Sequence, residues 1–442
     1  MHKFPLLITL FASLLTAAPA AAQQQANPQR LQGYVEKLVS FGTRHTLSSA
    51  EDPKRGIGAA RRWAAAEFES ISKSCNNCLT IENLERRMSG PRAPDGVNIV
   101  NVLAIKAGKM GFDHVIIISG HIDSRVTDIM NFTGDAPGAN DNASGSALVI
   151  EAARIIAQLP QTEATIIFAL LSGEEQGLMG GRLLAETAKE RGWKVSALLN
   201  NDIVGGTRGT DGRKVDNIVR VFSEGIRASE TIEAQLARRG SGGEDDGPSR
   251  ALARRIKDVG GASKAEIGLD VFAVQRPDRF GRGGDHLPAL ELGFPAVRFT
   301  VGIEDYDHQH QDLRTENGRK FGDTADEMDF NYLAKVTMLN VATVGSLADA
   351  PPAPQQATLG GAVSSDTIVR WTPVKGATGY DIHVRRNDKK DWQQVIRVDD
   401  PAATSHTLTG VIVDDHFVGV SARGAAGSGG SLITFAGLPP RP

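Results

Sequence analysis

The sequence has two cysteines, few aromatic residues and almost no net charge, and these shortages narrow what the protein can be. The 49 Lys and Arg residues nearly balance the 52 Asp and Glu residues, which leaves a formal net charge of −3. No global positive field is therefore available to hold nucleic acid or an anionic membrane. Aromatic residues make up 5% of the chain while glycine occurs 48 times, which indicates many tight turns. No long hydrophobic run follows the first two dozen residues, so no transmembrane segment is expected there.

What the chain does contain is typical of a globular protein with more than one domain. Its 442 residues predict two or three domains, at roughly 100 to 200 residues each. Residues 1–22 carry Lys3, the apolar stretch LLITLFASLL and a small-residue run that ends at Ala22, which is typical of a secretory signal peptide. The apolar stretch is too short for a membrane anchor. We therefore expect the mature protein to begin near Gln23 and to be exported to a periplasmic or extracellular space.

The only cysteines, Cys75 and Cys78, lie close together in SCNNC. An exported chain meets an oxidising environment, in which such a pair usually closes into a disulfide. The same spacing occurs in redox motifs and in half-sites for zinc, but the sequence has no second cysteine pair, and the flanking residues do not run from a strand into a helix. The prediction is a local disulfide.

Composition divides the sequence into two domains joined by a linker. Residues 349–357, which include PPAPQQA, are expected to be a proline-rich linker after a helical pattern. The first predicted domain is 23–348 and the second is 358–442. The second contains short alternating runs broken by Gly, Asp and Pro, at the spacing of a small all-β sandwich. With Trp371 in one run and Tyr380 in the next, it resembles a fibronectin type III domain in pattern.

Before the linker, apolar β-rich runs alternate with helical patterns. The expected buried strands are VNIVNVLAI, HVIIIS, ATIIFALL and VSALLNN, and helical periodicity separates the later ones in ASGSALVIEAARIIAQL and GLMGGRLLAETAKERG. This order predicts an α/β fold whose mixed, mostly parallel sheet is covered by helices on both faces. Residues 238–251 (RRGSGGEDDGPSRA) have no hydrophobic period and are expected to be a mobile surface loop that could border the substrate entrance.

Acidic and histidine side chains stand where the predicted strands end. They are His121 and Asp123 after HVIIIS, Asp141 before a helix, Glu174 and Glu175 after ATIIFALL, Asp202 after VSALLNN, and a last cluster of His308, His310 and Asp312. Each alone has an ordinary explanation, such as a turn, a helix N-cap or a solvated face. Three consecutive strands, however, bring them to the sheet edge at which open α/β sheets bind ligands. About four negative charges gathered there need compensation, and two divalent cations would supply it.

The motifs GHIDS, GANDNASG, SGEEQGLMGG, NND and HQHQD occur in this order in the M28 zinc peptidases, which include bacterial leucyl aminopeptidases with two zinc ions. The sequence resembles that family over about residues 26–348. The resemblance implies a zinc-peptidase fold in which two Zn²⁺ share the carboxylate of Asp141. It also implies that His121 and Asp202 complete one zinc site, while Glu175 and a late histidine complete the other.

The remaining roles follow from the same resemblance. Glu174 would be the general base that takes a proton from water, and Asp123 would orient His121. The last zinc ligand is either His308 or His310, and we favour His310.

Three further residues are expected near the site. The segment GGDHLPALELGFPAVRFT matches a recurrent M28 segment that lines the site, and its Asp285 and His286 are expected to support the centre rather than to bind zinc. Tyr306 is expected either to donate a hydrogen bond to the developing oxyanion or to pack.

The leading hypothesis is a secreted di-zinc aminopeptidase, a metallo-exopeptidase that removes residues from peptides with a free N-terminus. Glutaminyl cyclases resemble the same family but use one zinc ion, and carboxypeptidases also occur within it. A non-catalytic binding protein with an adhesive β domain is the third possibility. A complete ligand set for two metal ions favours hydrolysis over these alternatives. Zinc content per chain separates them, with two ions for the peptidase, one for the cyclase and none for the binding protein.

Overall fold

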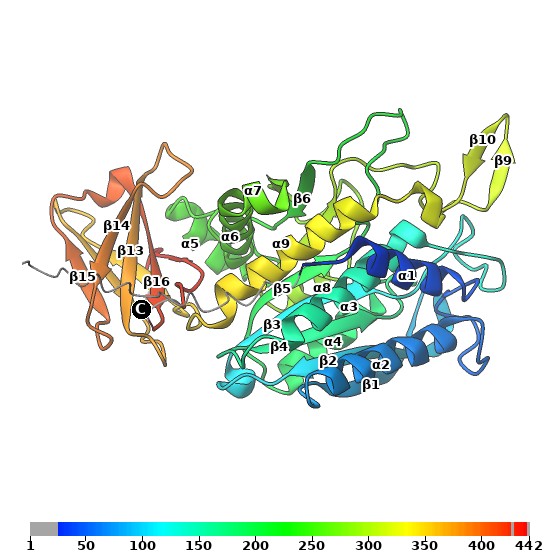
Figure 1. Cartoon of the computed structure of the whole chain (residues 1–442). Coiled ribbons are helices and arrows are strands. Elements are labelled where there is room, and N and C mark those ends of the chain that lie inside the picture. The colour runs from blue at the N-terminus through cyan, green and yellow to red at the C-terminus, as the bar shows by residue number, and fades with distance from the viewer. Residues whose placement is uncertain (1–24, 426–427, 440–442) are drawn as a thin grey trace, which may run out of the picture.

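The computed structural model describes residues 25–425 and 428–439, so the predicted signal peptide lies outside the described residues. A large α/β domain carries a smaller β domain at one end, and the long helix α9 leads from the first to the second (Figure 1). Among the described residues, no helix is both long enough and apolar enough to cross a membrane.

The first domain is built on one eight-stranded sheet with the order β1-β2-β4-β3-β5-β8-β6-β7. At its centre β4, β3, β5 and β8 run parallel, whereas β2 and β6 join this block antiparallel. The strands are β1 (Thr80–Gly90), β2 (Ala93–Lys106), β3 (Val115–His121), β4 (Thr165–Leu171), β5 (Val195–Asn201), β6 (Ile218–Phe222), β7 (Asp270–Val274) and β8 (Ala296–Val301). The prediction of a mixed, mostly parallel sheet is confirmed.

The central strands are buried on both faces, and their consecutive side chains alternate between two hydrophobic cores. Ile118 and Phe168 point into one core, whereas Ile117 and Ile167 point into the other. Because successive side chains of a strand face opposite sides, only a continuous apolar run can fill both cores. The runs HVIIIS and ATIIFALL meet this requirement.

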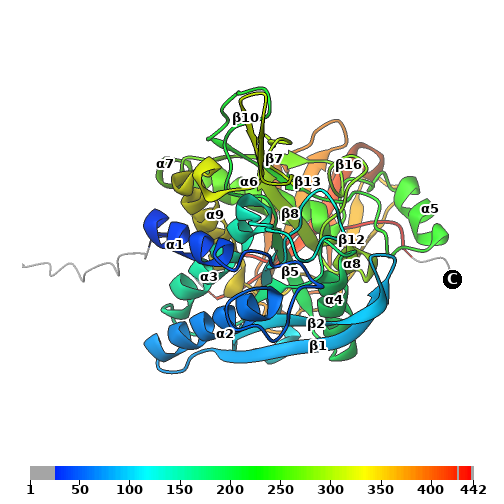
Figure 2. The same cartoon turned by 90° about the vertical axis from the view of Figure 1, so that its right-hand side faces the viewer.

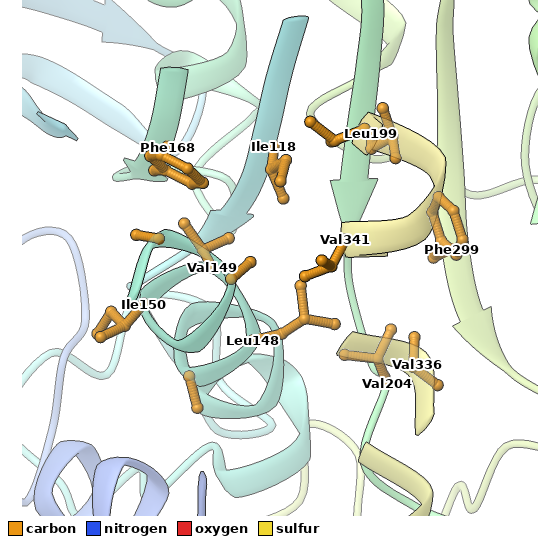
Figure 3. Close-up of a cluster of buried hydrophobic side chains, with 14 of the residues drawn as sticks. Ile118, Leu148, Val149, Ile150, Phe168, Leu199, Val204, Phe299, Val336 and Val341 are labelled. Atoms are coloured by element: carbon orange, nitrogen blue, oxygen red, sulfur yellow. The ribbon is translucent and has the colours of Figure 1, made fainter. Parts of the chain in front are cut away.

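Helices cover both faces of the sheet. Figure 3 shows Leu148 and Val149 of α3 and Val336 and Val341 of α9 packed beneath the central strands. α1 and α2 lie on this same face, where α1 is beside α3 and α9 and α2 is beside α3 (Figure 2), while α4 and α8 cover the opposite face. The helices are α1 (Pro28–Val39), α2 (Ile57–Ser74), α3 (Ser144–Ala157), α4 (Met179–Glu190), α5 (Ile232–Gly240), α6 (Pro248–Ala262), α7 (Lys264–Ile267), α8 (Leu287–Glu291) and α9 (Phe330–Ala348).

A disulfide joins Cys75 to Cys78 directly after α2, as predicted. The two residues between them, Asn76 and Asn77, both have a φ of 59°. Asparagine tolerates this left-handed backbone better than most residues, and the chain can therefore turn back from the helix within the bridge.

The second domain consists of two antiparallel sheets, with the orders β11-β12-β15 and β14-β13-β16-β17. Their facing sides enclose a separate core, in which the rings of Trp371 and Tyr380 lie 5.1 Å apart. The strands are β11 (Ala357–Gly360), β12 (Thr367–Trp371), β13 (Gly379–Arg386), β14 (Gln394–Val398), β15 (Ser405–Leu408), β16 (His416–Arg423) and β17 (Thr434–Phe435), and a separate hairpin of β9 (Arg314–Glu316) and β10 (Arg319–Phe321) projects from the first domain.

The segment 238–251 differs from the surface loop that the sequence predicts. Its ends belong to α5 and α6, and the buried Asp246 between them pairs with Arg385 of β13 at 2.6 Å. Phe435 of the β domain packs so closely on Gly243 that a Cβ there would lie 2.4 Å from the ring. Hydrophobic periodicity does not show that this segment is partly buried, because it packs against an arginine and an aromatic ring of the other domain.

We expect Asp246→Ala to lower the free energy of unfolding by about 3–5 kcal/mol, since it leaves Arg385 and Arg254 without their buried carboxylate. The neighbouring Asp245→Ala is the matched control, because the Asp245 side chain is 59% exposed. Urea unfolding of both variants checks this. Equal losses in the two variants would show that the buried pair contributes nothing specific.

Candidate metal centre

Most of the predicted site residues converge at the carboxyl ends of the parallel strands. His121 is the last residue of β3, and it lies level with Leu171, the last residue of β4. The remaining members are Glu174 and Glu175 just after β4, Asp202 just after β5, Asp141 in the irregular segment before α3, and His310 in the loop that follows β8.

These residues form two groups that meet at one carboxylate. In each group the possible ligand atoms lie within 4.8 Å of one another, and the groups are His121, Glu174 and Asp202 on one side and Asp141, Glu175 and His310 on the other. Asp141 Oδ1 lies 3.2 Å from His121 Nε2, whereas its Oδ2 lies 2.9 Å from His310 Nε2. A single carboxylate therefore faces both groups, one oxygen to each.

Three side chains, His121, Asp141 and Asp202, are placed to hold a zinc ion. His121 Nε2 is buried and has no hydrogen-bond partner among the described residues, although the carboxylates of Asp141 and Asp202 lie 3.2 and 3.6 Å away. Ligands of a tetrahedral zinc ion, each about 2.0–2.1 Å from the metal, stand about 3.4 Å apart. The observed separations bracket that value, and the nitrogen and oxygen donors are of the types that zinc accepts.

Asp123 connects the two glutamates to His121. The ring Nδ1 of His121 lies 3.1 Å from the backbone oxygen of Asp123 and 3.4 Å from its carboxylate. The same carboxylate accepts the backbone N–H groups of Glu174 and Glu175 and the hydroxyl of Thr46. A proton on Nδ1 leaves Nε2 to face the metal position.

Two buried residues hold the segment that carries Asp141. The carboxylate of Asp323 accepts the N–H groups of Asn140 and Asp141, both at 2.7 Å. The guanidinium of Arg44 donates to backbone oxygens on both sides of the site, including those of Ile122 and Gly138. Neither residue is recognisable from the sequence, because each acts on backbone atoms distant along the chain.

The structure brings His310 to the centre, but not His308. His308 Nδ1 contacts the backbone oxygen of Gly322 at 2.8 Å, so its ring is engaged away from the two groups. Asp285 and His286 are buried and belong to neither group, and Asp285 accepts the Gly181 N–H at 3.0 Å. Tyr306 is 58% exposed.

Sequence reasoning missed two arginines that contact the carboxylates. Arg298 of β8 is fully buried and lies 2.9 Å from Asp202 Oδ2, and Arg125 lies 2.7 Å from Glu175 Oε2. Each arginine engages one carboxylate oxygen and leaves the other free to face the centre. Arg298 had a detectable signal, since it is a lone charge within an apolar strand.

Burial and nearby charges shift the pKa values of two groups in the centre, Glu174 and His310. Burial, together with the carboxylates of Asp202 and Glu175, raises the pKa of Glu174 well above its ordinary value. Burial lowers the pKa of His310, but the carboxylates of Glu175 and Asp141 outweigh it and raise that pKa to about 10. The other ring nitrogen of His310, Nδ1, lies 2.5 Å from the guanidinium of Arg125.

We expect zinc to be released as the pH falls. Burial lowers the pKa of His121, but the carboxylates of Glu174 and Asp202 outweigh it and raise that pKa well above its ordinary value. Protons therefore compete with zinc for Nε2 below this raised pKa, and zinc affinity should increase with pH through the neutral range. Zinc retained per chain after dialysis at a series of pH values checks this. Retention independent of pH would contradict it.

The sequence matches known peptidases along most of its length. Residues 98–329 match the model of peptidase family M28. A probable zinc metalloprotease of Pyricularia oryzae is 41% identical over 413 residues, which cover 90% of this chain and 81% of that protein. A second, from Leptosphaeria maculans, is 40% identical over 384 residues, covering 86% of this chain and 88% of that protein. The chain therefore belongs to peptidase family M28 and is a zinc metallopeptidase.

Solved structures share the fold at low sequence identity. The LapA aminopeptidase of Legionella pneumophila superimposes with a TM-score of 0.51 at 17% identity, covering 73% of this chain and 72% of that one. A glutaminyl cyclase of Fimbriiglobus ruber gives a TM-score of 0.52 at 19% identity, with coverages of 72% and 95%. One fold thus carries two different reactions in these neighbours, and only the chemistry of the site can separate them.

Proposed function

We propose that this protein is an exported di-zinc aminopeptidase that removes residues from the N-termini of peptides. The observation that carries the proposal is the carboxylate of Asp141, whose two oxygens face two separate groups of ligand atoms. In this proposal His121 and Asp202 complete one zinc site with Asp141, and Glu175 and His310 complete the other.

Zinc held there supplies Lewis-acid chemistry, which polarises the scissile carbonyl and makes water easier to deprotonate. Glu174 accepts the proton of the attacking water and returns it to the nitrogen of the leaving amine. Burial and the neighbouring carboxylates raise the pKa of Glu174, so the group holds a transferred proton more tightly until it passes to the leaving amine. Asp123 holds the His121 ring and the backbone of Glu174 in one fixed relation.

The hollow beside Asp141 favours a substrate with a free amine. Among the described residues that line it, there are five acids and one arginine, Arg208; the acids are Asp141, Glu304, Asp305, Asp323 and Glu327. Asp141 binds zinc in this proposal, Glu304 is compensated by Arg220 and Arg282, and Glu327 lies 3.7 Å from Lys320, so Asp305 and Asp323 remain against the arginine. A protonated α-amine is attracted to such a surface, while a C-terminal carboxylate is repelled. The charge therefore supports an aminopeptidase over a carboxypeptidase.

A panel of substrates tests the proposal. We expect the zinc-loaded protein to hydrolyse aminoacyl p-nitroanilides and free peptides, and to leave the same peptides intact when the N-terminus is acetylated. A peptide that begins with glutamine serves as the cyclase control, because cyclisation releases ammonia without cutting the chain. Release of C-terminal residues, or of ammonia alone, would contradict the assignment.

The other parts of the chain fit an exported enzyme. We propose that residues 1–22 are removed as a signal peptide, and N-terminal sequencing of the secreted form tests this. The β domain is proposed to be a fibronectin type III-like module, supported by its facing three- and four-stranded sheets. All the residues proposed to act in catalysis precede it, so its role lies in stability or in the binding of larger substrates.

A further inference from the structure

The two histidines of the centre have opposite partners on the ring nitrogen that faces away from the metal position. Nδ1 of His121 meets acceptors, namely the backbone oxygen and the carboxylate of Asp123 at 3.1 and 3.4 Å. Nδ1 of His310 meets a donor, the guanidinium of Arg125 at 2.5 Å. An arginine has no acceptor, so His310 Nδ1 must be the acceptor in this contact.

This difference limits which form each ring can take when its Nε2 binds a metal. A neutral imidazole that binds a metal through Nε2 carries its proton on Nδ1. His121 can take that form where it stands, because Asp123 accepts the Nδ1 proton. His310 cannot, because an N–H on Nδ1 would point at an N–H of Arg125.

The distances from Nε2 to the nearest carboxylate oxygens also differ between the two histidines. His121 Nε2 has no hydrogen-bond partner among the described residues and stands 3.2 and 3.6 Å from carboxylate oxygens. His310 Nε2 lies 2.9 Å from both Asp141 Oδ2 and Glu175 Oε1, at the length of an N–H···O hydrogen bond. Nε2 of His310 therefore lies closer to its two carboxylates than Nε2 of His121 does.

We propose that Arg125 weakens zinc binding in the half of the centre formed by Asp141, Glu175 and His310, so that the half formed by His121 and Asp202 fills first. An ion can bind His310 Nε2 only when Arg125 withdraws from Nδ1, which then takes up the ring proton. The guanidinium also places a positive charge 2.7 Å from Glu175 Oε2. Arg298 places a similar charge 2.9 Å from Asp202 Oδ2 in the other half but contacts no ring nitrogen of His121, so the contact with the histidine is what distinguishes the two halves. The inference rests on the two-zinc site proposed above.

The test is stepwise addition of Zn²⁺ to the full chain after metal removal with a chelator. Calorimetry gives the affinity of each step, and elemental analysis gives zinc per chain. We expect two unequal steps in the unsubstituted protein. Arg125→Met should tighten the weaker step by about 10- to 100-fold and leave the tighter one unchanged.

Arg92→Met is the matched control, because Arg92 donates to the backbone oxygen of Glu175 at 2.7 Å and contacts neither the carboxylate nor the ring of His310. Both zinc-binding steps of Arg92→Met should have the same affinities as those of the unsubstituted protein. Arg125→Ala repeats the test without the methionine side chain in the site. A residue that merely supports Glu175 would weaken the second step when removed, so the sign of the change separates the two roles.

The outcomes separate this inference from the function on which it rests. Two zinc ions bound in every variant, with the second step unchanged or weakened by Arg125→Met, overturn the inference alone. Saturation at one zinc in the unsubstituted protein and at two in Arg125→Met supports it. Saturation at one zinc or none in both overturns the two-zinc centre and the inference together.

Discussion

Glu174→Gln should keep the zinc content of the protein and lose most of its activity. The amide has nearly the shape of the carboxylate but cannot accept a proton from water, so kcat should fall by about 10²- to 10⁴-fold. Substrate binding should survive. Zinc per chain by elemental analysis, measured beside kcat and KM for an aminoacyl p-nitroanilide, checks the prediction.

The adjacent Glu175 supplies the control. Its carboxylate lies 2.9 Å from His310 Nε2, and it is proposed to hold zinc, so Glu175→Ala should lower the zinc content together with activity. If Glu174→Gln loses zinc while Glu175→Ala keeps both ions, the two assignments are reversed. If both variants stay fully active, the two-zinc peptidase mechanism fails.

Asp141→Ala should remove both zinc ions at once, because this carboxylate is the only one in the described structure that faces both groups. Losing the Lewis acids removes several kcal/mol of transition-state stabilisation, so kcat/KM should fall by about 10³-fold or more. Zinc per chain and kcat/KM are the measurements.

Asp135→Ala is the matched control for Asp141→Ala. Asp135 lies in the same loop, and its side chain is 63% exposed and pairs with Arg55. This variant should keep both ions and full activity. An Asp141→Ala protein that still holds one zinc would show that the two sites do not depend on a shared ligand.

The sequence by itself determined the central sheet and brought together most of the residues of the candidate metal centre. Strands that must fill a core on each face are continuous apolar runs, so HVIIIS and ATIIFALL are visible without a structure. In a parallel sheet their carboxyl ends meet at one edge, and this places His121, Glu174 and Glu175 together before any distance is known. The local disulfide followed from the position of two neighbouring cysteines.

Only the tertiary structure decided the rest, because the remaining contacts join residues that no local pattern connects. It placed His310 rather than His308 against Asp141, although both occur in the same short motif. It also brought Arg125 to His310 across 185 positions of the chain, and it buried Asp246 against the other domain. Hydrophobic periodicity in a sequence indicates which side chains of a segment face the core. An ion pair between residues that are distant in the sequence produces no such periodicity.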